Sequence, residues 1–96
     1  MIVSVCKIIL SLPSRNLKEK RRLLKSLSSR ILNKFSVDVA EVDCNDRSET
    51  AVIGFAVVAN SGNIASRRIE IILDFIEESR MMTQIVDIDR ETITGF

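Results

Sequence analysis

The sequence predicts a two-layer α+β fold, because segments with the two-residue period of strands and segments with the 3.6-residue period of helices alternate along the chain. Residues 2–12, 37–44, 50–60 and 82–94 have strand character, while helical periodicity begins at residue 17 and again near residue 61. The resulting order, β-α-β-β-α-β, is that of the ferredoxin-like fold. We therefore expect a four-stranded antiparallel sheet with two helices on one face, formed by residues 1–96 as a single domain.

The first strand, residues 2–12, separates its side chains onto two faces. One face carries Cys6, Ile8, Leu10 and Leu12, and the other carries Val3, Val5, Lys7 and Ile9. Pro13 ends the strand, since proline has no backbone donor and restrains the residue before it.

The first helix is expected from Leu17 onward, with an apolar stripe made by Leu17, Leu24, Leu27, Ile31 and Phe35. Asn16 is a good N-cap, and Glu19 three residues later completes a capping-box pattern. Glu19 is also placed to form an ion pair with Arg22.

After this helix, residues 37–44 indicate a short strand and "NDRSE" a polar turn, before the nearly continuous apolar strand of residues 50–60. Ser61, Gly62 and Asn63 begin the second helix, whose core stripe is Ala65, Ile69, Ile72, Phe75 and Ile76. Residues 82–94 form the last strand. Right-handed crossovers leave the first and third strands in the middle of the sheet.

Cysteine use and composition limit the possible functions. Cys6 falls on a central strand and Cys44 near the end of an edge strand, which favours two reduced thiols and a cytoplasmic location. The first 13 residues have no basic region typical of a signal peptide, and no segment approaches a membrane span. The chain has no histidine, so we expect no Ser-His or Cys-His catalytic pair, no metal site with histidine ligands and no cofactor.

Positive charge is concentrated at the start of the first helix, where residues 15–25 read "RNLKEKRRLLK". Residues 15–34 carry eight Lys/Arg side chains and one acid, Glu19. Cations at a helix N-terminus oppose the helix dipole, whereas a phosphate there meets free N–H groups and several cations together. The candidate anion-binding or nucleic-acid-binding residues are Arg15, Lys18, Lys20, Arg21, Arg22 and Lys25.

Helical geometry separates these cations into two groups. Lys18, Arg21, Arg22 and Lys25 form one exposed stripe, whereas Lys20 lies within the apolar sector and is expected to extend its stem over the core to the domain rim. Glu41 is expected to be buried and paired with Lys20, or to lie on a sheet edge. An enzymatic site around Lys20 and Glu41 is a further alternative, which would need a pocket.

The strand "IGFAVVAN" fits the RNA-reading pattern of ferredoxin-like domains only at Gly54, Phe55, Ala56 and Val58. One ring is a poor platform for stacking bases, so any contact with RNA is expected to be to its phosphates. Val3, Val5 and Ile9 on the open sheet face suggest instead a homo-oligomer or a protein partner.

The basic block at Leu17–Arg22, the A-E-V at Ala40–Val42 and the strand "AVIGFAVVAN" resemble the YlxP-like family of small bacterial proteins of unknown function. The resemblance covers about residues 1–60 and implies a ferredoxin-like fold with no established activity, cofactor or catalytic residue. Genes of this family often neighbour genes for translation and ribosome assembly. Relatives commonly carry Gln and Trp in the loop where this chain has Asn45 and Ser48, so this chain lacks that aromatic.

Three functions are therefore compared below. The leading one is a non-enzymatic accessory module that contacts RNA phosphates, on ribosomal particles, through the basic helix. The second is a protein-interaction or homo-oligomerisation module that uses the open sheet, with the basic helix as a plain solvated surface. The third is the enzyme with a Lys20–Glu41 site.

Overall fold

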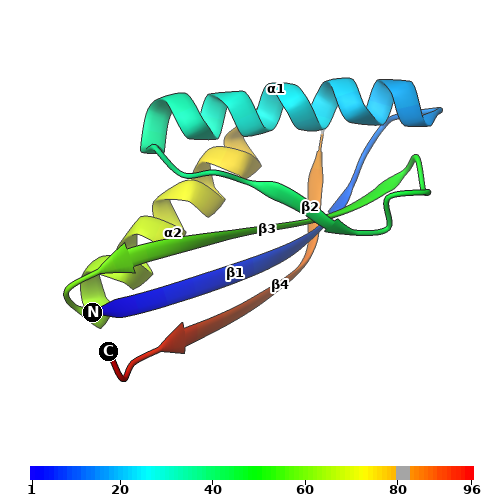
Figure 1. The fold of residues 1–96 in the computed structure, drawn as a ribbon. Helices are drawn as coiled ribbons and strands as arrows, with labels where there is room; N and C mark the ends of the chain where they lie inside the picture. The colour runs from blue at the N-terminus through cyan, green and yellow to red at the C-terminus, as the bar shows by residue number, and fades with distance from the viewer. Residues whose placement is uncertain (80–82) are drawn as a thin grey trace.

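A computed structural model describes residues 1–79 and 83–96, and it confirms the expected fold class. Over these residues the order is β1 (Ile2–Ser11), α1 (Leu17–Phe35), β2 (Ala40–Asp43), β3 (Thr50–Ala59), α2 (Gly62–Glu78) and β4 (Gln84–Ile93). The strands form one antiparallel sheet in the order β2-β3-β1-β4, so β1 and β3 are central as predicted. Figure 1 shows both helices on one side of this sheet.

Two predicted strands differ from the observed ones at their ends. The strand expected at residues 37–44 is paired only over Ala40–Asp43, and a register shift between Glu41 and Asp43 interrupts even this short pairing with β3. Val37 and Val39 precede β2 and are buried in the core without belonging to a strand. The expected start of the last strand, at residue 82, lies outside the described residues, and β4 begins at Gln84.

The core lies between the sheet and the two helices. Its sheet side comes from alternate residues of the central strands, since Cys6, Ile8 and Leu10 pair with Phe55, Ile53 and Ala51 in direct register. The helix side is made by the predicted stripes, with Leu24, Leu27 and Ile31 from α1 and Ala65, Ile69, Ile72 and Ile76 from α2 buried. Phe35 and Phe75 close one end of this core, edge to face, with ring centroids 5.4 Å apart.

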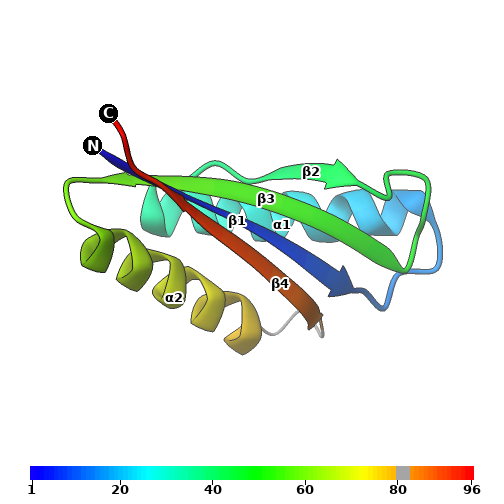
Figure 2. The same ribbon diagram turned by 90° about the horizontal axis from the view of Figure 1, so that it is seen from below.

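The other face of the sheet is covered by neither helix. Figure 2 shows the ribbon from below, where the strands pass in front of α1. The side chains on this open face are Val3, Val5, Lys7 and Ile9 from β1, as predicted, together with their neighbours on β3 and β4. Cys6 is buried on the helix side, and both Cys6 and Cys44 are free thiols.

Candidate functional site

The N-terminus of α1 is fixed by the predicted cap. Asn16 has an extended backbone, and its side chain accepts a hydrogen bond of 2.9 Å from the backbone N–H of Glu19. The Glu19 carboxylate accepts a bond of 2.8 Å from the backbone N–H of Arg15, one residue earlier than in the usual capping box. Because this carboxylate is directed back toward Arg15, it forms no ion pair with Arg22, and that prediction was wrong.

The cap determines where the cations that follow it lie. We use the name basic helix face for the exposed side chains Arg15, Lys18, Arg21, Arg22 and Lys25. From Lys18 to Lys25 the helix rises by about 10 Å, so four of the five charges follow one another over two turns. Among the described residues, no carboxylate lies within ion-pair distance of any of the five. Their charge is therefore not neutralised within the described structure.

Lys20 is in a different environment, although it belongs to the same sequence block. Its side chain is only 1% exposed, and its ammonium lies 2.6 Å from the Glu41 carboxylate. It also donates hydrogen bonds of 2.6 Å to the backbone oxygens of Cys44 and Arg47. The pairing with Glu41 was predicted. The ammonium was also expected to reach the domain rim, and this prediction was wrong, because the β2–β3 loop closes over it.

This loop is held by several backbone contacts around the ammonium. Cys44 takes a left-handed conformation with φ of 58°, and its carbonyl accepts a 3.1 Å bond from the N–H of Arg47. The Ser14 hydroxyl donates to the Ser48 carbonyl, and the N–H of Leu12 donates to Glu49 over 2.8 Å. The loop thus connects the end of β1, the start of α1 and the edge strand β2.

The burial of Lys20 bears on two earlier expectations. The ammonium donates to two loop carbonyls and lies at ion-pair distance from Glu41, and the side chain is only 1% exposed, so Lys20 is not accessible to a phosphate. Four surface hollows of the described residues are lined by side chains other than Lys20 and Glu41, and one of them, about 470 Å³, is lined by residues 46–50 of the loop that covers the ammonium. The Lys20–Glu41 enzyme stays a prediction. We therefore omit Lys20 from the basic helix face. The two carbonyls were missed because main-chain acceptors leave no signal in a sequence.

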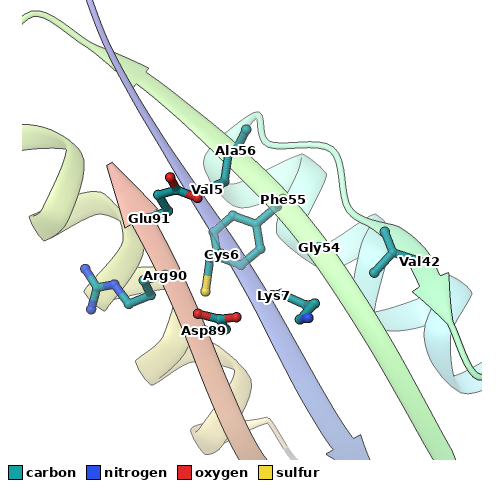
Figure 3. Close-up of a pocket in the computed structure, with 10 residues that line it drawn as sticks. All are labelled: Val5, Cys6, Lys7, Val42, Gly54, Phe55, Ala56, Asp89, Arg90 and Glu91. Carbon is teal, nitrogen blue, oxygen red and sulfur yellow. The ribbon is translucent and has the colours of Figure 1, made fainter. Parts of the chain in front are cut away.

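The open sheet face has a different chemistry from the basic helix face. Figure 3 views this face with the helices behind the sheet and labels the ten residues that line a shallow hollow. The volume of this hollow is about 480 Å³. Gly54 contributes no side chain to its floor, and Val42 from β2 closes one side. Asp89 and Glu91 of β4 lie on the other side, with Lys7 of β1 between the two.

Phe55 is the one aromatic of the partial RNA-reading pattern, and it is not on the open face. It is 6% exposed and pairs with Cys6 on the helix side of the sheet. A base could not stack on it without opening the core. The match of "IGFAVVAN" to that pattern therefore reflects an apolar central strand.

The described residues contain neither a membrane-spanning helix nor a group of metal ligands. Neither α1 nor α2 is long and apolar enough to span a membrane. Cys, Asp and Glu side chains do not gather there in any group of three or more that could hold a metal ion.

Comparison with known proteins shows similarity to a family and to a solved fold. Residues 3–90 match a family model described as a protein of unknown function, DUF503. The chain is 34% identical over 62 residues to the uncharacterised protein YlxP of Bacillus subtilis strain 168, which covers 65% of this chain and 67% of YlxP. Among solved structures, a de novo designed protein, Foldit4, aligns over the full length of both chains with a TM-score of 0.54 and 18% identity. That similarity concerns the fold alone.

Proposed function

The chain belongs to the DUF503 family of proteins of unknown function, and from this premise we propose that it is a non-enzymatic accessory module that contacts RNA phosphates. The contact surface is the basic helix face, and the RNA is that of ribosomal particles. A cytoplasmic location is part of the same proposal.

The observation that carries this proposal is the unneutralised charge of the basic helix face. Five exposed cations surround the first turns of α1, and no carboxylate of the described residues pairs with them. The cations closest to the helix N-terminus, Arg15 and Lys18, each cost about 0.3–1 kcal/mol through the helix dipole, an effect that falls off within the first turn. An anion bound there would reverse that cost, because it interacts favourably with both the dipole and the cations.

Phosphate is the anion that best fits an extended row of this kind. Lysine and arginine recognise it through charge-assisted hydrogen bonds, and a row of cations can follow successive phosphates of one strand. Since Phe55 is buried, we attribute no base recognition to this domain. Binding should therefore tolerate any sequence and weaken steeply with salt.

The test is a triple variant, Lys18→Gln, Arg21→Gln and Lys25→Gln, titrated with a fluorescent single-stranded RNA oligonucleotide at several salt concentrations. The slope of log K against log salt is negative, and loss of three phosphate contacts should make it less steep by about 2. Salt-washed bacterial ribosomal subunits, tested by co-sedimentation, supply the second probe. The triple variant should be largely lost from the sedimented fraction.

The matched control is Lys7→Gln, Arg30→Gln and Arg67→Gln, three exposed cations outside the basic helix face. It removes the same net charge, so it measures the general effect of lowering the charge. An equal loss of RNA affinity in both triple variants would contradict a specific surface. Unchanged binding in the first triple variant would remove the proposal.

A further inference from the structure

The open sheet face carries an apolar strip two strands wide. Residues that face each other across β1 and β3 on this face are Val3 and Val58, Val5 and Ala56, and Ile9 and Val52. Val42 of β2 extends the strip beside Gly54 and is 54% exposed, and Val58 is 55% exposed. Neither helix covers this strip: Ala56, Val58 and Val42 are exposed and Val3, Val5 and Ile9 partly exposed, whereas Val52, beyond the Lys7–Gly54 pair, is buried.

A row of carboxylates borders the strip along β4. Asp87, Asp89 and Glu91 lie opposite Ile9, Lys7 and Val5 of β1, on the same face of the sheet. Alternate residues of a strand are about 6.8 Å apart, so the row is about 14 Å long. None of the three forms an ion pair with a cation of the described residues, and Lys7 is the one cation beside them. The net charge of this border is negative.

This arrangement disfavours two of the partners considered above. RNA phosphates would be repelled by the acidic row, which lies on the sheet layer, away from the basic helix face. A second copy, packed face to face about a two-fold axis across the strands, would bring two acidic rows together. If the two-fold axis instead ran along the strands, the β4 carboxylates of each copy would pack against the less acidic β2 side of the other. These carboxylates would then be desolvated with no cation to pair with, which is unfavourable.

We propose that the open sheet face binds an amphipathic helix of another protein, with its apolar side on the β1–β3 strip and a row of Lys or Arg side chains along the β4 carboxylates. Two strands, each about 4.8 Å from its neighbour, offer a width of about 10 Å, which equals the diameter of a helix. Cations four residues apart on that helix are about 6 Å apart along its axis, close to the carboxylate spacing. This inference does not depend on the RNA-binding proposal.

The probes are two synthetic helical peptides with the same apolar side, one with Lys and Arg in the bordering row and one with Glu there. Each is titrated into the full chain and followed by amide chemical shifts, up to millimolar peptide. The basic peptide should shift amides of β1, β3 and β4 and bind about tenfold more tightly than the acidic peptide.

Two variants divide the interaction into its charged and apolar parts. Asp87→Asn, Asp89→Asn and Glu91→Gln together should weaken the basic peptide about tenfold. The matched control, Asp74→Asn, Glu77→Gln and Glu78→Gln, removes three exposed acids from α2 and should leave the affinity unchanged. Val42→Thr with Val58→Thr keeps the β-branched shape and should weaken both peptides, since it removes only apolar surface.

Five results would overturn the inference. They are an absence of shifts with the basic peptide, equal affinity for the two peptides, and equal effects of the two acid-removing variants. The fourth is a dimer in light scattering that the Val42→Thr/Val58→Thr variant dissociates, since it would assign the strip to a second copy. RNA that moves the open-face amides would equally refute it.

Discussion

Replacing Lys20 with Met should destabilise the domain strongly, although the change looks mild. Met fills the space of the aliphatic stem but removes the ammonium, so the Glu41 carboxylate and the carbonyls of Cys44 and Arg47 lose their common partner. Breaking a buried ion pair on one side costs about 3–5 kcal/mol. Glu41 is 21% exposed and can regain some water, so we expect a loss at the lower end, about 3 kcal/mol.

Urea unfolding monitored by circular dichroism measures this loss. For a slope of about 1.5 kcal/mol/M, a loss of about 3 kcal/mol lowers the midpoint by about 2 M. The slope itself should not change. The double variant Lys20→Met/Glu41→Leu also removes the Glu41 carboxylate that Lys20→Met leaves unpaired, so it should be no less stable than Lys20→Met alone. The coupling energy between the two positions should be about 2 kcal/mol. Amide exchange should accelerate first in residues 44–49, because the loop loses its anchor.

Lys18→Met is the control, since Lys18 is exposed in the same turn and its loss should change stability by less than about 0.5 kcal/mol. If Lys20→Met costs less than about 1 kcal/mol, the level of a surface ion pair, then the reasoning that Lys20 anchors the loop is wrong.

Three further changes test other parts of the structure. Asn16→Ala should cost about 1 kcal/mol in urea unfolding and Asn16→Ser almost nothing, because Ser also caps the Glu19 amide; equal losses would refute the cap. Gly54→Ala should raise stability by about 0.5–1 kcal/mol in the same assay, since its new Cβ would lie 3.4 Å from Val42, and a loss would show that the strands cannot accommodate it. Burial raises the pKa of the Cys6 thiol, so the folded state holds this proton more tightly than the unfolded state. The stability that this proton contributes is therefore fully present below the thiol's ordinary pKa, about 8.5, and is lost as pH rises through the higher folded value. Unfolding of the wild type and of Cys6→Ala at alkaline pH measures this loss. The same fall in stability in the Cys6→Ala variant would contradict the reasoning.

Local sequence was sufficient for the elements and their order. Asn16 and Glu19 mark the start of α1, Pro13 ends the first strand segment, and the apolar stripes of both helices lie where their periodicity places them. The central positions of β1 and β3 follow from this order and from the handedness of crossovers. The same alternation assigned Val3, Val5, Lys7 and Ile9 to the face opposite the core.

The sequence placed Lys20 apart from the other cations of its block but could not determine whether its ammonium is enclosed. Its helical direction indicated the apolar sector, but a lysine there can either reach solvent or be enclosed, and the outcome depends on what lies above it. Lys20 is covered by the β2–β3 loop. The oxygens that bond to its ammonium are the backbone carbonyls of Cys44 and Arg47, which lie 24 and 27 positions later in the chain.

The acidic border of the open face was also not identified from the sequence. Asp87, Asp89 and Glu91 become a row beside the apolar strip only through the register of β4 against β1, which includes a shift between Ile9 and Leu10. Local patterns depend on neighbours along the chain, and these determined the elements, their faces and the basic block. Which charges are enclosed, and which are brought together at one edge, depends on contacts between residues far apart in sequence, and only the tertiary structure decided those.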